Sequence, residues 1–183
     1  STAALDSASI EELSKSEVDG KKVEELVTEE ISKIGEHLTI RRLKKLNGAN
    51  LYTYVHNSVK PNMGKIGVIV KLSKDDSEFG KKVAMHVAAA NPASLSEEDL
   101  SVDLIEREKT IFVEQAKETG KPANIIENMV KGRLKKYYEE VTLLNQKYVL
   151  DPSLTVREAS FNAGVEVLDF IRMEVGDGIE KKE

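Results

Sequence analysis

Apolar residues recur every three to four positions in several stretches of the chain, which is the spacing of amphipathic helices. The pattern predicts one helix over Lys21–Lys33 that closes near Gly35, because glycine adopts the left-handed conformation that ends many helices. A second predicted helix, Glu78–Ala90, stops where Asn91-Pro92 prevents its continuation. The capping-box spacing of Ser9-Ile10-Glu11-Glu12 predicts a further short helix near the start of the chain.

Two longer helical patterns, Val102–Glu118 and Ala123–Val141, are separated only by Thr119-Gly120-Lys121-Pro122. The Gly ends one helix and the Pro begins the next, so the two helices must fold back antiparallel. The apolar stripe of the second helix is wider than one partner helix covers, so we expect it to meet another surface. This stripe contains Ile125, Ile126, Met129, Val130, Leu134, Tyr137, Tyr138 and Val141.

Strand patterns occupy the segments before residue 73. Thr39–Leu46 is charged and roughly alternating, Leu51–Asn57 is rich in Tyr, Val and Thr, and Ile66–Leu72 is apolar and β-branched. The intervening residues Ser58–Gly64 contain Pro, Asn and Gly and are predicted to form a loop. The pattern therefore predicts a small sheet with a buried strand at Ile66–Leu72.

The last part of the chain returns to mixed structure. Asp151-Pro152-Ser153 is predicted to turn, Thr155–Ala163 to form a short helix and Val165–Val175 to form a strand. This final strand needs a partner sheet, and the only candidates precede residue 73. The fold class is therefore α+β: a small antiparallel sheet packed with helices, with an inserted antiparallel helical hairpin.

Composition narrows the function classes. The 183 residues are 40% apolar and 32% charged, with no cysteine and a net charge of −5. This balance is typical of a globular protein without disulfides, and it disfavours broad nucleic-acid binding. We interpret the basic clusters Arg41-Arg42 and Arg133-Leu134-Lys135-Lys136 as solvated faces. No apolar run approaches the ~20 residues of a membrane helix, so we expect no membrane partner.

Few residues are arranged for catalysis. Gly64-Lys65-Ile66-Gly67 lacks the spacing of a phosphate-binding loop, and no cofactor site is expected. The histidines His37, His56 and His86 are far apart, and His86 is predicted to pack inside a helix interface. Residue types and spacing thus favour a non-catalytic binding module without a metal. A metal-dependent enzyme that uses these histidines with carboxylates such as Glu36 stays open as the alternative.

One segment carries a family signature. Ile34-Gly35-Glu36-His37 followed by Ile40-Arg41-Arg42 resembles the IGEN-x-x-IRR signature of elongation factor Ts. Further matching segments follow in the order that the family has. They are Tyr54-Val55-His56, Gly64–Val68, Ala84–Ala89, Gly120-Lys121-Pro122, Met129–Arg133, Tyr148–Pro152 and Phe170-Ile171-Arg172 through Gly176–Lys181. The chain is therefore identified as a member of the elongation factor Ts family.

The resemblance implies a domain organisation. It assigns residues 39–101 and 144–183 to the second of two related core subdomains and residues 102–143 to an inserted, coiled-coil-like dimerisation hairpin. Residues 1–38 correspond to the linker and helix between the subdomains. The family's N-terminal domain, its first subdomain with a Thr-Asp-Phe-Val motif, and its C-terminal helix have no counterpart in this sequence.

The resemblance also implies a function: guanine-nucleotide exchange on elongation factor Tu, in the bacterial cytoplasm or an organelle matrix. In the family, residues that match Ile34, Gly35 and His56 press into the nucleotide domain of elongation factor Tu. Homodimerisation through the hairpin is implied as well. The residues expected at that contact are Ile125, Ile126, Met129, Val130 and Leu134.

Overall fold

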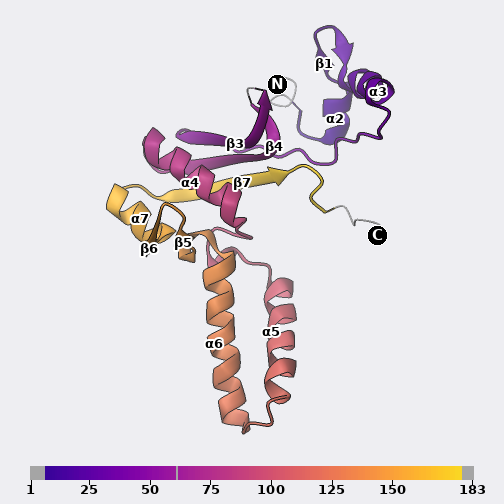
Figure 1. Ribbon diagram of the computed structural model, residues 1–183. Helices are drawn as coiled ribbons and strands as arrows, with labels where there is room; N and C mark the ends of the chain where they lie inside the picture. Colours follow the sequence, from indigo (N-terminus) through magenta and orange to yellow (C-terminus); the bar gives the residue numbers. More distant parts are fainter. Residues whose placement is uncertain (1–6, 61, 179–183) are drawn as a thin grey trace. The chain divides into compact units, whose positions relative to one another are not determined.

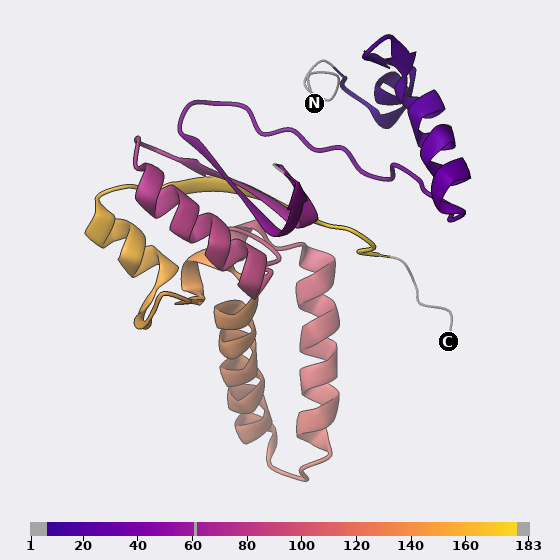
Figure 2. The same cartoon turned by 45° about the horizontal axis from the view of Figure 1, so that its top comes forward.

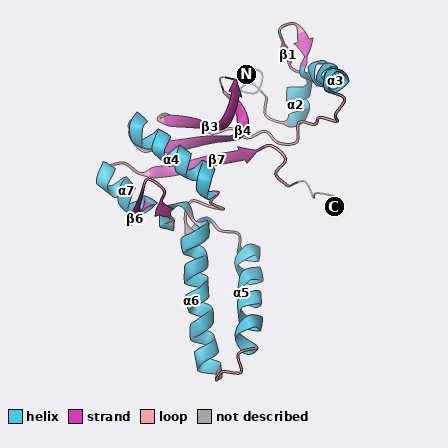
Figure 3. Cartoon of the chain, in the orientation of Figure 1, coloured by secondary structure: helices cyan, strands magenta, loops and turns pink. Residues whose placement is uncertain are grey.

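The computed structural model describes residues 7–60 and 62–178, and the chain divides into two compact units, residues 1–47 and 48–183. Helices and small antiparallel sheets alternate along the chain (Figure 3), so the predicted α+β class is confirmed. Across the part that the structure describes, no helix is both long and apolar enough to cross a bilayer.

The first unit is built from two short helices joined by a tight two-stranded turn. The Ser9 side chain accepts a hydrogen bond from the Glu12 amide at 3.1 Å and so begins the first helix, as its capping pattern predicts. Gly35 ends the second helix at φ 77°, the left-handed conformation predicted for it. The elements are α2 (Ile10–Lys15), β1 (Glu17–Val18), β2 (Lys21–Lys22) and α3 (Val23–Ile34).

The predicted strand over Thr39–Leu46 is wrong, because these residues form neither a helix nor a strand. The half-buried residues here are Ile40, Leu43 and Leu46. They recur at every third position, whereas a strand with one buried face needs every second position. A strand also needs a neighbour for its backbone hydrogen bonds, and within residues 7–60 and 62–178 none pairs with this segment.

The second unit contains a three-stranded antiparallel sheet in the order β3 (Leu51–Lys60), β4 (Met63–Leu72) and β7 (Val167–Glu174). The final strand pairs with β4 from Ile66 opposite Glu174 to Leu72 opposite Val167, so its predicted partner sheet is confirmed. The predicted loop Ser58–Gly64 is shorter than expected, because β3 continues to Lys60 and β4 begins at Met63.

Helix α4 (Ser77–Ala90) covers one face of this sheet (Figure 1). Alternate β4 residues point at the helix and are almost fully buried, since a strand places every second side chain on one face. The Asp76 side chain caps the helix, and Asn91 ends it in the left-handed conformation. Phe79, Val83 and Val87 of α4 are buried, whereas Ala90 at its end is only half-buried. The core includes Val68, Val70 and Leu72 of β4, Val83 and Val87 of α4, and Leu143 and Val156.

A helical hairpin leaves the sheet domain between α4 and β7. Helices α5 (Val102–Lys117) and α6 (Ala123–Val141) run antiparallel side by side (Figure 2), as predicted. The two ends of the excursion meet, because the Leu143 amide donates to the Ser94 carbonyl at 2.9 Å. The hairpin is therefore an insertion that returns the chain to the point where it left. Short 3₁₀ turns flank it at η1 (Glu97–Asp99) and η2 (Leu143–Asn145).

A further short β-hairpin and a short helix connect the helical hairpin to β7. They are β5 (Lys147–Tyr148), β6 (Asp151–Thr155) and α7 (Val156–Ala163). The turn predicted at Asp151-Pro152-Ser153 is wrong, since the chain turns at Val149 and Leu150 and the predicted residues begin β6. Proline is accepted near the start of such an edge strand because its missing amide leaves no ladder bond unmade.

Candidate functional site

The exposed His56 lies on β3 opposite Ile66 of β4, near the point where β7 ends. Its ring lies on the same face of the strand as Tyr54, two residues earlier. The Tyr54 hydroxyl and His56 Nδ1 form a hydrogen bond of 3.1 Å, and the two ring centroids are 6.1 Å apart. The tyrosine thus orients the imidazole while the rest of the ring stays open to solvent.

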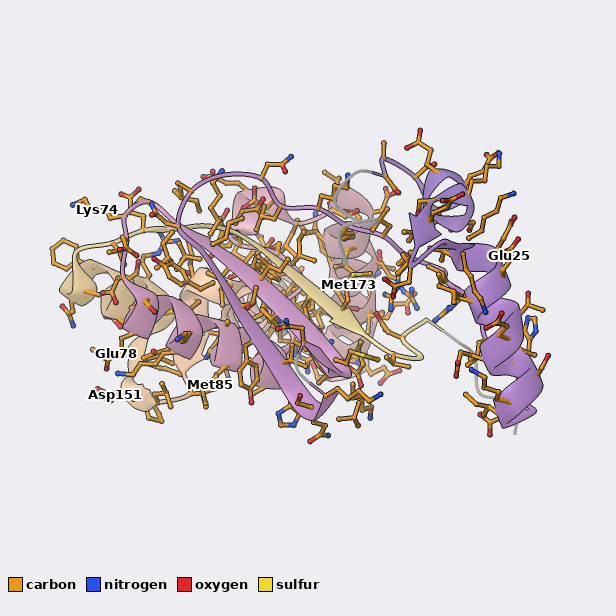
Figure 4. The ribbon with its side chains drawn as sticks, turned by 90° about the horizontal axis from the view of Figure 1, so that it is seen from above. Glu25, Lys74, Glu78, Met85, Asp151 and Met173 are labelled. Atoms are coloured by element: carbon orange, nitrogen blue, oxygen red, sulfur yellow. The ribbon has the colours of Figure 1, made fainter. Side chains whose placement is uncertain are left out.

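A surface hollow of about 490 Å³ lies beside His56. Its lining comes from β3, β4, β7, α4 and the β5–β6 turn, which are brought together by the fold. The apolar residues at its mouth are unusually exposed for their type: Met85 by 41%, Val149 by 50% and Leu150 by 48%. Met85 is labelled on α4 in Figure 4. An apolar rim of this kind is typical of protein interaction sites.

One wall of the hollow is charged. Arg172 Nη2 lies 2.8 Å from Glu174 Oε2, and the guanidinium also donates to the Ala88 carbonyl at 3.4 Å. The hydrogen bond from Arg172 is the main reason that the pKa of Glu174 lies below its ordinary value, and Lys65 at 3.6 Å adds to the effect. The Glu174 carboxylate is therefore ionised at neutral pH, and the wall presents this anion beside the Arg172 guanidinium.

His86 lies beneath the hollow and is only 1% exposed. Its Nδ1 accepts a hydrogen bond from the Val149 amide at 3.1 Å, which leaves the proton on Nε2 for a 2.9 Å bond to Gln146 Oε1. Burial lowers its pKa from the ordinary value, so the ring is neutral at pH 7. The prediction of a packing histidine is confirmed: Nδ1 holds the β5–β6 turn on α4, and Nε2 holds Gln146, the residue before β5.

Ile34 and Gly35 belong to the first unit, whereas His56 belongs to the second. The Ile34 side chain is 55% exposed at the last position of α3, although its spacing fits the apolar stripe of that helix. The Gly35 amide donates to the Ile31 carbonyl at 2.8 Å, and the glycine leaves the backbone open, since a Cβ there would have no neighbour within 4 Å. This helix end therefore presents an apolar side chain and a bare backbone to solvent.

The residues predicted at the dimer contact lie on α6 and differ in exposure. Val130 is 6% exposed, and on the other helix of the hairpin Ala116 of α5 is fully buried. Ile125 is 41% exposed, and Ile126, Met129 and Leu134 are half-buried. The hairpin is held further by the 6.3 Å edge-to-face contact of Phe112 with Tyr137. An apolar strip at Ile125, Ile126, Met129 and Leu134 thus stays partly open to solvent.

Sequence reasoning selected His56 but missed Met85, Arg172 and Glu174. A usable signal existed, because the hollow draws residues from segments that carry the family resemblance: Tyr54-Val55-His56, Ala84–Ala89, Tyr148–Pro152 and Phe170-Ile171-Arg172. These segments are distant in sequence and adjacent in space.

For the residues that the structure describes, no cluster of three or more histidine or acidic side chains is placed to hold a metal ion.

An α+β domain with a hairpin insertion, an apolar rim and a fixed ion pair has the features of a protein-binding module. The family model described as elongation factor TS matches residues 1–177. The chain belongs to the elongation factor Ts family, and the recognition from its motifs is confirmed.

Bacterial relatives are similar over nearly all of the chain. It is 51% identical to elongation factor Ts of Dinoroseobacter shibae over 181 residues, which cover 99% of this chain and 62% of the relative. The protein of the same name from Paracoccus denitrificans is 52% identical over 184 residues, covering 98% and 62%. That from Roseobacter denitrificans is 49% identical over 177 residues, covering 97% and 61%. The chain thus spans somewhat less than two thirds of the length of these relatives.

Proposed function

We propose that this chain is part of a non-catalytic guanine-nucleotide exchange factor of translation elongation, which binds elongation factor Tu in the cytoplasm and promotes the release of GDP. The observation that carries the proposal is the family match over residues 1–177. The exposed, oriented imidazole of His56 and the exposed end of α3 at Ile34 and Gly35 support it.

The physical basis is differential binding, so no covalent step is needed. Elongation factor Tu holds GDP through a phosphate loop and Mg²⁺. A protein that binds better to the loosened, metal-free state raises the population of that state. The coupling is reciprocal: bound GDP weakens the exchange factor as much as the exchange factor weakens GDP.

Three residues are proposed to form the contact. Ile34 offers an apolar side chain, Gly35 allows the partner's surface to approach the backbone closely, and His56 offers a polar ring at the edge of the sheet. The Tyr54 hydroxyl supports this role for His56, because a ring already held in one orientation loses less entropy on binding.

The proposal extends to the domain organisation. Residues 39–101 and 144–183 form the second core subdomain, residues 102–143 the dimerisation hairpin, and residues 1–38 the linker and helix that precede them. The Thr-Asp-Phe-Val motif, which the family uses as its main wedge, does not occur in this sequence. We therefore expect this chain to bind elongation factor Tu while stimulating GDP release only weakly.

Release of fluorescent mant-GDP from elongation factor Tu tests the proposal. The wild-type chain is expected to bind and to accelerate release, by less than a relative that contains the Thr-Asp-Phe-Val motif. His56→Ala should weaken the complex and leave the thermal midpoint nearly unchanged, because the side chain is exposed.

Val68→Ala is the matched control for stability. Val68 is 2% exposed, so truncation opens a cavity and costs about 2–4 kcal/mol of folding free energy. The folded fraction of this variant should still bind like wild type. If His56→Ala binds as tightly as wild type, His56 is not part of the contact.

A further inference from the structure

The β3–β4 ribbon continues past His56 as two strands alone. Strand β7 ends at Glu174 opposite Ile66, whereas β3 and β4 stay paired through Ser58 opposite Gly64 and Lys60 opposite Met63. Near its end the ribbon exposes large apolar side chains: Val59 is 78% and Met63 is 57% exposed. We call Val59, Lys60 and Met63 the ribbon tip.

The backbone next to the ribbon tip contains a left-handed residue and a shift in strand register. Asn57 adopts φ 51°, a left-handed conformation uncommon for a residue with a side chain, and the register shifts between Ser58 and Lys60. Gly64 pairs with Ser58 on the neighbouring strand, and a Cβ there would lie 2.5 Å from Val55 Cγ1 and 2.6 Å from the His56 carbonyl, so only glycine fits. Bulges of this kind redirect a strand, and the ribbon turns away from the rest of the sheet where it ends (Figure 1).

The chemistry of the ribbon tip is that of a small docking element. Two apolar side chains stand in solvent, and Lys60 places an ammonium beside them. Apolar side chains that stay exposed at the open end of a ribbon favour unwanted association. We therefore expect a partner protein to cover the ribbon tip. Two side chains supply only a fraction of the ~800 Å² per partner that a stable interface buries. The ribbon tip therefore belongs to a larger contact.

The ribbon tip continues the strand that carries His56, which supports one larger contact that includes both. His56 lies three residues before Val59 on the same strand, and the hollow with its apolar rim adjoins His56. We propose that the ribbon tip is a second docking element for the protein that binds His56. Val59 and Met63 enter an apolar depression of that protein, and Lys60 meets a carboxylate at its edge. This inference rests on the proposed function, in which the partner is elongation factor Tu.

The test uses the whole chain with the double substitution Val59→Ser and Met63→Ser, and measures the dissociation constant with elongation factor Tu. We expect the complex to weaken by about tenfold or more, the loss expected when two side chains at the centre of a contact are truncated. Phe161→Ser is the matched control, because Phe161 on α7 is 85% exposed and lies outside the ribbon. It should bind like wild type. Lys60→Glu should slow association, and the difference from wild type should shrink at high salt.

The possible outcomes separate this inference from the proposed function. If the wild type does not bind elongation factor Tu, the proposed function fails and this inference falls with it. If the wild type binds and the double variant binds equally well, only the inference about the ribbon tip is overturned. It is also overturned if the wild type self-associates and the double variant is monomeric by light scattering, because the occupant is then a second copy. Unchanged circular dichroism of the double variant excludes misfolding as the cause of a loss.

Discussion

At the scale of single residues, His86 joins segments that are 60 residues apart in sequence. It accepts from the Val149 amide and donates to Gln146, whose own side-chain amide donates to the Glu140 carbonyl at 2.7 Å. A proton added to Nδ1 would remove the acceptor for Val149 and place a charge in the core. Folding therefore favours the neutral ring.

This arrangement predicts a pH dependence of stability. Burial holds the folded-state pKa of His86 below its ordinary 6.5, so the unfolded chain takes up a proton at a higher pH than the folded chain. The contribution of His86 is complete above about pH 6.5 and is lost as the pH falls towards the folded-state pKa. In urea unfolding at pH 7.5 and 5.5, wild type should lose more stability than His86→Gln.

The change in unfolding free energy between the two pH values is the decisive measurement. The His86→Gln substitution also lowers stability at every pH, because it leaves polar groups unpaired. His37→Gln is the matched control, since His37 is exposed in the first unit. Its pH dependence should match wild type. Parallel curves for wild type and His86→Gln would show that His86 does not account for the effect.

At the scale of elements, α4 and β3 approach each other closely at Gly80. A Cβ at this position would overlap the ring of Tyr52, which is held in turn by hydrogen bonds with Asp75 and the Asp76 amide. Gly132 on α6 differs, because a Cβ there would have no neighbour within 4 Å. The two helical glycines thus make opposite predictions for the same substitution.

Gly80→Ala should destabilise the protein by about 1–3 kcal/mol, since the methyl group forces Tyr52 or the helix to move. Gly132→Ala should stabilise it by roughly 0.5–1 kcal/mol, because alanine loses less backbone entropy in a helix. Thermal or urea unfolding of both variants measures the difference. Equal effects of the two substitutions would contradict the close packing of α4 on β3.

Helices were more predictable than strands at this scale. The bounds of α6 match the prediction and those of α3 and α4 nearly do, because local spacing and end residues such as Gly35 and Asn91 specify them. The strand predicted at Thr39–Leu46 failed because strands depend on a neighbour that a local pattern does not reveal. For the same reason, the pattern missed that Ser58–Lys60 continues β3.

At the scale of the whole molecule, the partly open strip on α6 bears on the proposed dimer. Ile126→Asp with Met129→Asp should give a monomer if the strip joins two copies, because buried carboxylates at the contact would lose their hydration. Light scattering measures the mass, and circular dichroism checks that the hairpin stays helical. Asn128→Asp, at an exposed position of α6, is the control for added charge and should keep the wild-type mass.

The mass of the double variant is compared with the mass of the wild type. A dimeric wild type with a monomeric double variant supports the contact at Ile125, Ile126, Met129 and Leu134. If the wild type is a dimer and the double variant keeps its mass, the hairpin is not the dimer contact.

The helices, the hairpin insertion and the family could all be predicted from the amino-acid sequence alone. Each of these depends on local spacing or on short motifs, and Ile34-Gly35-Glu36-His37 is readable without a structure. The need of the last strand for an earlier sheet also followed, because unpaired backbone groups in a strand are costly.

The way in which distant segments combine could not be predicted and depends on tertiary packing. The hollow beside His56, the Arg172–Glu174 pair in its wall and the contacts of His86 unite elements from both sides of the helical hairpin. The bend of the ribbon likewise depends on the left-handed Asn57 and on Gly64, which pairs with the next residue, Ser58, across the two strands. These features arise from packing between residues far apart in the chain, and hydrophobic periodicity carries no information about which distant residues meet.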